Sequence, residues 1–176
     1  DANGALQWTK TYGGAGFDYG YSVQQTTDNG FVIAGYTYSF GAGDANAYLI
    51  KTDNLGALTW AWAFGGNADD ELNSVRQTSD GGYIVAGYSK SFGNGKEDVF
   101  VVKTDNAGVQ TWSKTFGDSD IDIARSVAES SAGGYVIAGS SKSFGSSSEK
   151  VYLIKIDANG DEEWAKTYGG AFHDRG

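Results

Sequence analysis

The sequence predicts an all-β fold made of tandem 52-residue units with four strands each, the pattern of β-propeller blades. Three observations predict it. Residues recur at a constant step of 52 positions, as in the series Trp8, Trp60, Trp112 and Trp164. Each period holds four short runs of apolar and β-branched residues, separated by Gly, Asn and Asp. No stretch shows the sustained period of an amphipathic helix.

The repeat keeps its register along the whole chain, without an insertion or a deletion. The same step of 52 links a second series, which consists of Asp18, Asp70, Asp122 and Asp174. Three periods use 156 of the 176 residues, and the last 20 residues repeat the first 20. We therefore interpret residues 1–176 as one repeat array. Residues 1–20 are the end of a repeat, and three repeats follow over 21–72, 73–124 and 125–176, the last running into the start of the next.

Each period begins with a predicted hairpin. In the first period, residues 21–26 (YSVQQT) and 31–38 (FVIAGYTY) are the expected strands, and TDNG joins them. An Asn-Gly pair between two such runs is a strong hairpin signal because both residues accept a positive φ at low cost. The later copies SDGG and SAGG are expected to do the same.

The third and fourth predicted strands follow a loop rich in Gly, Ala and Asn. They span residues 47–52 (AYLIKT) and 57–64 (ALTWAWAF), joined by DNLG. Asp at the first position and Gly at the fourth suit a tight turn. Apolar residues alternate in the fourth strand, so Trp60, Trp62 and Phe64 are expected on one face.

With these strands placed, the stretches GG…D, NGFVIAGYT and YLIKTDNLG resemble the SBBP-type β-propeller repeat of large secreted bacterial and archaeal proteins. The resemblance implies that Val23 lies on an innermost strand and that the four periodic tryptophans lie on outermost strands. The spacing of Asp53, Gly56 and Trp60 is also distantly similar to the tryptophan-docking motif of pyrroloquinoline-quinone propellers, with one residue fewer between Asp and Gly. A β-trefoil is the alternative fold, but it stops at three units whereas this sequence runs into a fourth.

Three repeats are too few to close a propeller ring, which takes ~4–8 blades. We therefore expect a partial or open propeller that is completed by more of the same polypeptide, by other copies or as an open superhelix. The absence of an initiator methionine and of a leader pattern favours a processed chain or a part of a longer repeat protein. Head-to-tail contacts that do not close would produce a filament.

Composition disfavours several classes of function. The net charge of −9 disfavours nucleic acid and anionic membranes as partners, since both attract basic surfaces. No apolar run approaches the ~20 residues that cross a bilayer. The chain has no cysteine, so disulfides and thiolate chemistry are excluded.

The periodic aspartates have two interpretations. They could be calcium ligands, one in each repeat: Asp18, Asp70, Asp122 and Asp174. They could instead accept backbone hydrogen bonds in the loop that enters the first strand. We favour the structural interpretation because Ca²⁺ takes 6–8 oxygen ligands and no DxDxDG-like run is present. No cofactor is expected, with calcium as the open possibility.

The tryptophans invite a carbohydrate-stacking hypothesis, but a residue that recurs in every repeat is typical of packing between repeats. Breaks in the periodicity point to contact residues instead. Trp62 stands where the other copies have lysine, and so does Tyr38. Lysine at the same positions indicates access to water, so these aromatic residues are candidate partner or glycan contacts. The aromatic first repeat extends this candidate set to Trp62, Tyr38, Tyr36 and Tyr21.

The sequence favours a non-catalytic structural or adhesive repeat module at an extracellular or cell-surface location. Every strongly recurrent position has a packing or turn role, whereas a catalytic site normally breaks the symmetry of a repeat. The first alternative is a propeller that binds carbohydrate or peptide. The second is a quinoprotein-like oxidoreductase with a calcium-held cofactor, which only the distant pyrroloquinoline-quinone resemblance implies.

Overall fold

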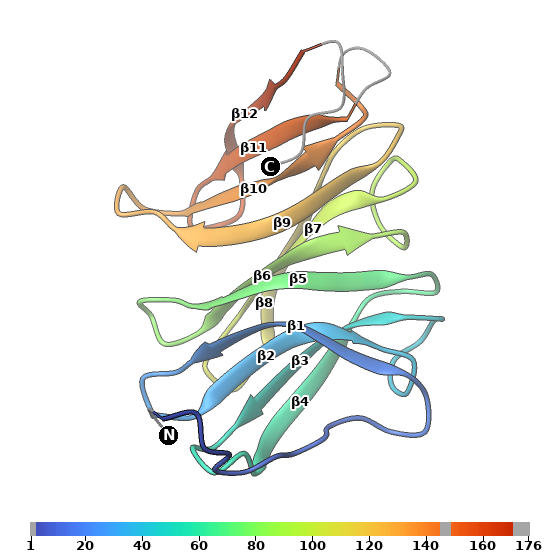
Figure 1. Ribbon diagram of the computed structural model, residues 1–176. Coiled ribbons are helices and arrows are strands. Elements are labelled where there is room, and N and C mark those ends of the chain that lie inside the picture. Colours follow the sequence, from blue (N-terminus) through green and yellow to red (C-terminus); the bar gives the residue numbers. More distant parts are fainter. Residues whose placement is uncertain (1–2, 145–148, 171–176) are drawn as a thin grey trace.

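The computed structural model describes residues 3–144 and 149–170, which form twelve strands and no helix. The strands make three four-stranded antiparallel sheets, each from one repeat (Figure 1). The first sheet contains β1 (Asp18–Gln25), β2 (Phe31–Thr37), β3 (Asn46–Thr52) and β4 (Leu58–Phe64). The second contains β5 (Asp70–Gln77), β6 (Tyr83–Ser89), β7 (Asp98–Thr104) and β8 (Gln110–Phe116). The third contains β9 (Asp122–Glu129), β10 (Tyr135–Ser141), β11 (Lys150–Ile156) and β12 (Glu162–Tyr168).

This architecture confirms the all-β fold class with tandem four-stranded units. Within each sheet the strands lie in chain order, so every repeat completes its own sheet. That arrangement corresponds to stacked blades and differs from a β-trefoil, in which strands of all three units share one barrel. The described residues contain no helix long and apolar enough to span a membrane.

The first strand of each sheet begins earlier than predicted. In the first sheet it begins at Asp18 instead of Tyr21, because Asp18, Tyr19 and Gly20 pair with the end of β2 beyond a bulge between Gly20 and Ser22. The bulge places backbone against backbone: a Cβ on Gly35 would lie 1.7 Å from the carbonyl oxygen of Tyr19. Only glycine fits there, which explains why glycine recurs at this position.

The predicted turn between the third and fourth strands is confirmed. The Gly56 amide donates to the carbonyl oxygen of Asp53 over 3.2 Å, and Gly56 has a φ of +74°. The Asp53 carboxylate accepts the amides of Leu55 and Ala57 over 2.9 and 2.8 Å. Asp and Gly therefore serve separate purposes in this turn: the carboxylate satisfies loop amides and glycine allows the left-handed conformation.

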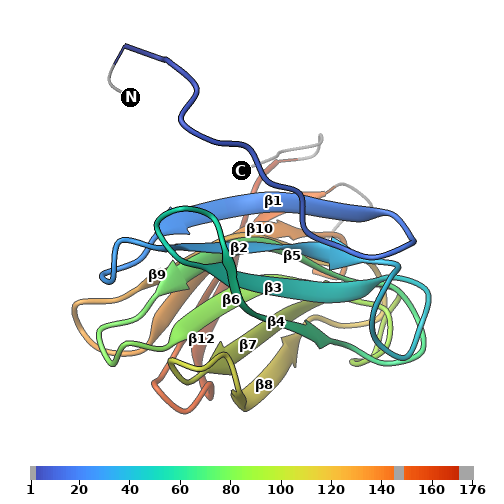
Figure 2. The ribbon, with the colours of Figure 1, turned by 90° about the horizontal axis from the view of Figure 1, so that it is seen from below.

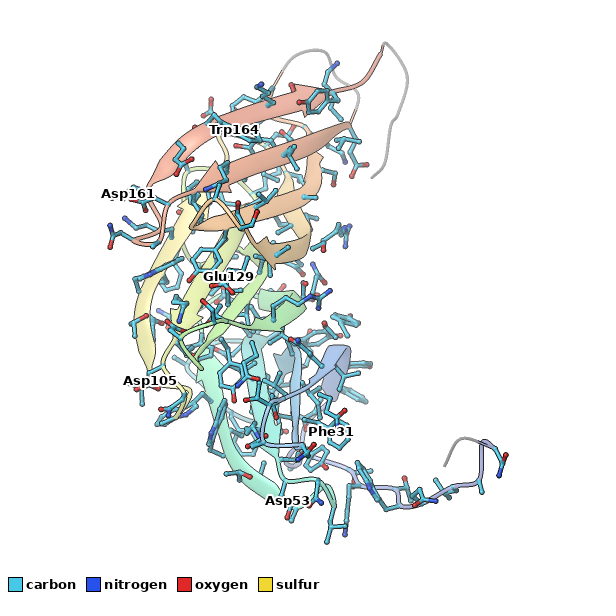
Figure 3. All side chains as sticks on the ribbon, turned by 90° about the vertical axis from the view of Figure 1, so that its left-hand side faces the viewer. Phe31, Asp53, Asp105, Glu129, Asp161 and Trp164 are labelled. Carbon is cyan, nitrogen blue, oxygen red and sulfur yellow. The ribbon has the colours of Figure 1, made fainter. Side chains whose placement is uncertain are left out.

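The sheets stack in chain order and form a curved array (Figures 1 and 3). The first strand of each following sheet contacts the first and second strands of the sheet before it: β5 contacts β1 and β2, and β9 contacts β5 and β6. We call the side of a sheet that faces the next sheet its outgoing face, and the opposite side its incoming face. At the first junction, between sheets one and two, the outgoing face supplies Val32, Ala34, Ala47, Leu49 and Phe64. The incoming face supplies Leu72, Val75, Tyr83, Val85, Phe100 and Val102.

The second junction, between sheets two and three, repeats this packing. Its outgoing face carries Ile84, Ala86, Val99 and Val101, and its incoming face carries Ala124, Val127, Tyr135, Ile137, Tyr152 and Ile154. Polar contacts repeat as well: the Val75 amide donates to Ser22 Oγ, and the Val127 amide donates to Ser74 Oγ, each over 3.2 Å. The apolar core of the molecule thus lies between the sheets, where burial of both faces stabilises the stack.

Candidate functional site

A tryptophan from the fourth strand docks on the next sheet at both junctions. At the first junction Trp60 meets Tyr83 edge to face, with ring centroids 5.6 Å apart. Its indole also covers Gly108, where a Cβ would lie 2.6 Å from the ring. At the second junction Trp112 lies 6.1 Å from Tyr135 and covers a glycine of the equivalent turn. Each tryptophan therefore fits between a tyrosine ring and a turn glycine of the following sheet.

The same contact occurs on the incoming face of the first sheet, where Trp8 takes the part of the docking tryptophan. Its ring lies 5.9 Å from Phe31, edge to face, and a Cβ on Gly56 would lie 2.8 Å from the indole. The Tyr12 hydroxyl donates to the carbonyl oxygen of Gly56 over 2.7 Å. Residues 6–12, which we call the docked segment, belong to no strand, and Figure 2 shows the chain ahead of β1 lying outside the three sheets. The docked segment thus sits where the fourth strand of a preceding sheet would lie.

The docked segment covers the incoming face of the first sheet only in part. Val23 is 63% exposed, whereas its counterpart Val75 in the second sheet is fully buried. A cavity of about 270 Å³ remains between the docked segment and the sheet, lined by Tyr12, Ile33 and Ile50 among others. This face is therefore an apolar surface with room for further side chains.

The outgoing face of the third sheet is the complementary open surface of the described chain. Its side chains Val136, Ala138, Val151 and Leu153 are all partly exposed, although their counterparts at the first junction are fully buried. Trp164 is 37% exposed and has the Lys166 ammonium 5.2 Å from its ring centroid. Figure 3 shows Trp164 on the strand at the far end of the stack from Phe31. The two ends of the array thus present the two halves of the internal junctions.

The periodic aspartates lie at the start of the first strand of each sheet, and their carboxylates accept hydrogen bonds. Asp18 accepts the Gly14 amide and the Ser39 hydroxyl, both over 2.9 Å, and Asp70 accepts the equivalent groups of Gly66 and Ser91. Burial raises the pKa of Asp18, but hydrogen bonds from Thr37, Gly14 and Ser39 outweigh it and hold that pKa below its usual value.

Their calcium role stays a hypothesis. Among residues 3–144 and 149–170, no three acidic or histidine side chains gather in a group that could hold a metal ion. Asp174 lies outside the described residues.

The second junction contains two neighbouring buried carboxyl groups, Asp98 and Asp122. Both are at most 2% exposed, and one oxygen of each lies within 2.6 Å of the position that a Cβ on Gly117 would take. Burial raises the pKa of Asp98, and the negative charges of Asp122 and Asp118 raise it further. Asp122 Oδ1 is buried without a hydrogen-bond partner.

The first junction has an amide in the equivalent place, because Asn46 occupies the position of Asp98 there and faces Asp70. The signal for this difference was in the sequence, as Asn46, Asp98 and Lys150 stand one period apart. Nothing in the sequence showed that this position faces the periodic aspartate of the next repeat.

The periodic lysines are buried and form ion pairs with exposed carboxylates, and the sequence pattern did not predict these pairs. The Lys51 ammonium is buried and donates to the Asp28 carboxylate over 2.8 Å, and Lys103 repeats this with Asp80. The hydrogen bond from Lys51 is the largest of the effects that lower the pKa of Asp28 to about 2. In the third sheet alanine replaces this aspartate, and Lys155 pairs with Glu163 instead. In the first two sheets these pairs hold the turn between the first and second strands to the third strand, whereas in the third sheet the pair joins the third and fourth strands.

The structure brings together three of the four candidate contact residues. Tyr36 lies between Tyr21 and Tyr38, at centroid distances of 5.6 and 5.8 Å, and Tyr19 stacks on Tyr36 at 4.8 Å. Trp62 lies apart from this cluster on β4. It is 42% exposed and its indole N–H donates to the carbonyl oxygen of Ala107 over 2.9 Å. A role of these residues in binding a glycan or a peptide stays a prediction.

No model of a known protein family matches the chain, and no curated protein sequence matches it either. The likeness to the SBBP-type repeat therefore stays a prediction from the quoted stretches.

Proposed function

We propose that this chain is a non-catalytic structural repeat module, which assembles with further four-stranded sheets through its two end faces. Those sheets would come from the same polypeptide or from other copies of it. The resemblance to secreted repeats supports an extracellular or cell-surface location. One observation carries the proposal: a single interlock of tryptophan, aromatic ring and turn glycine joins the sheets internally, and its two halves lie at opposite ends of the array.

The chemistry of the end faces supports assembly over catalysis. Both faces are apolar surfaces that carry aromatic side chains, and burial of such surface is the main favourable term in protein association. Because the two faces differ from each other, a contact between copies is head to tail and produces a ring or a filament. Surfaces of this kind are expected in the subunit of a larger assembly.

The proposal predicts that Trp164 at the outgoing face is required for association. Trp164→Ala should lower the mass-average molecular weight measured by sedimentation velocity at high protein concentration, because it removes the side chain that docks on the next sheet. The comparison variant is Trp62→Ala, which removes a similarly exposed tryptophan that contacts the second sheet inside the array.

The loss of Trp164 should leave the far-ultraviolet circular dichroism spectrum unchanged, because the described chain has no sheet beyond this face. A wild-type protein that stays at 18.6 kDa at every concentration would contradict assembly of separate copies. Equal effects of Trp164→Ala and Trp62→Ala would show that the end face has no special role.

A further inference from the structure

We infer that the incoming face of the first sheet is the docking site for β12 of a second copy, and that the docked segment occupies this site until the second copy displaces it. The inference rests on the proposed function, since it names the partner of one end face. It adds that residues 6–12 compete with that partner, which makes assembly dependent on release of the segment.

The close sequence similarity of the two ends is the first support for this competition. Residues 1–14 read DANGALQWTKTYGG and residues 157–170 read DANGDEEWAKTYGG. The side chains that contact the first sheet are the same in both stretches: Trp8 corresponds to Trp164, and Tyr12 corresponds to Tyr168. A second copy can therefore place Trp164 against Phe31 and Gly56, as Trp8 is placed now. The two tryptophans cannot occupy that place together.

The internal junctions show what a full sheet adds beyond the docked segment. At the first junction, Trp60 arrives with the rest of an outgoing face, and together they bury Val75 and Val85 completely. The docked segment brings only its own side chains, so the counterparts Val23 and Ile33 keep access to water. The outgoing face of the third sheet carries the missing apolar side chains and is itself uncovered. Exchange of the segment for a second copy therefore buries apolar surface on both partners.

Release of the docked segment breaks few bonds. No strand of the three sheets pairs with residues 6–12, which are held by the Trp8 contacts and by the hydrogen bond from Tyr12 to Gly56. In contrast, β12 is held by a ladder to β11 that runs from the pair Val151–Tyr168 to the pair Ile156–Glu162. Displacement of the segment is thus easier than displacement of β12. The segment is tethered to its site, so a second copy has to overcome its high local concentration.

A different arrangement of two copies gives the opposite prediction for Trp8. In that arrangement residues 6–12 of one copy replace β12 on the other copy's β11, and Trp8 is then part of the interface. Loss of Trp8 would weaken association by strand exchange. It should strengthen association if the docked segment is a competitor.

The test is sedimentation velocity over a concentration series of the full chain with Trp8→Ala, Trp164→Ala and the double variant. If the segment covers the site in about nine tenths of the molecules, Trp8→Ala should lower the apparent dissociation constant about tenfold. Trp164→Ala should abolish association alone and together with Trp8→Ala. Tyr12→Phe removes only the hydrogen bond to Gly56. It should also lower the apparent dissociation constant, by a smaller factor than Trp8→Ala.

Three other outcomes would contradict either the competition or the proposed function. Weaker association of Trp8→Ala with a native circular dichroism spectrum would establish strand exchange and refute competition. If Trp8→Ala and Tyr12→Phe leave the apparent dissociation constant unchanged while Trp164→Ala abolishes association, competition by the docked segment is refuted. The proposed function is still supported in that case. If Trp164→Ala still associates, the proposed function, assembly through the end faces, is contradicted.

Discussion

At the residue scale, the second junction carries a conflict that the first junction avoids. Asp98 and Asp122 bring two carboxyl groups together out of contact with water, and two negative charges that close cannot both be stable there. A proton on Asp98 would remove the repulsion between the two carboxylates. The amide of Asn46 brings no second charge to the first junction at any pH.

Asp98→Asn is expected to stabilise the protein at neutral pH. The pKa of Asp98 is raised in the folded state, so the folded protein binds the proton more tightly than the unfolded chain. Stability is then complete below the unfolded pKa of about 3.9 and falls as pH rises through the folded pKa. The variant should gain on the order of 1 kcal/mol of unfolding free energy at pH 7, and the gain should disappear below about pH 4.

Urea unfolding at pH 7 and in acid measures this difference. The matched variant is Asn46→Asp, which creates a second acid pair with Asp70 at the first junction and should destabilise the protein at pH 7. A gain for Asp98→Asn that is equal at both pH values would show that repulsion between the carboxylates is not its cause.

At the element scale, the pairing of the first and second strands depends on a glycine opposite a bulge. Gly35, Gly87 and Gly139 occupy this place in the three sheets, and a Cβ on Gly87 would lie 1.8 Å from the carbonyl oxygen of Glu71. Backbone cannot move aside as a flexible side chain can. The constraint therefore belongs to the hairpin as a unit and recurs with every repeat.

Gly87→Ala is expected to lower the unfolding free energy by about 3 kcal/mol, because the added methyl group forces the two strands apart. Gly81→Ala is the comparison, as Gly81 lies in the turn of the same hairpin with a φ of +84° and open space around it. That change should cost only about 1 kcal/mol, from the left-handed backbone. Chemical denaturation of both variants tests the order, and equal losses would contradict a steric origin.

At the scale of the whole molecule, stability comes from contacts between neighbouring sheets, as in other repeat arrays. The central sheet has both faces buried, whereas the first and third sheets each have one face that no complete sheet covers. The array curves, and its end faces carry the same residue types as its interior (Figure 3). Addition of another unit at either end would therefore bury further apolar surface.

This predicts a thermal midpoint that depends on protein concentration. Association stabilises the folded state by mass action, so the Tm of the wild-type chain should rise by about 5 °C when the concentration goes from near the dissociation constant to a hundredfold above it. Trp164→Ala should show a constant Tm. Differential scanning calorimetry at several concentrations makes the comparison. A Tm that is independent of concentration in the wild type would argue against assembly of separate copies.

Much of the fold could be predicted because each repeat contains the local sequence signals of its own strands and turns. The Asp53–Gly56 turn and the four strands of each unit follow from short-range rules about backbone conformation and alternation. The early start of β1 could not be predicted, because the pairing of Asp18–Gly20 depends on a bulge that only the partner strand reveals. The candidate site, too, could be predicted only in part. The periodicity singled out the tryptophans, but the partners of each tryptophan lie in another repeat.

By itself, the sequence determined the repeat length, the strand number of each unit and the turns, since these depend on residues close together in the chain. Only the tertiary structure decided which faces meet, that Asp98 lies beside Asp122, and that Trp8 rests against Phe31 and Gly56 of the first sheet. Contacts between sheets join residues about one period apart, and their distances follow from how the sheets stack. The local sequence pattern determines each four-stranded sheet, and the packing of the sheets determines which faces remain exposed to a partner.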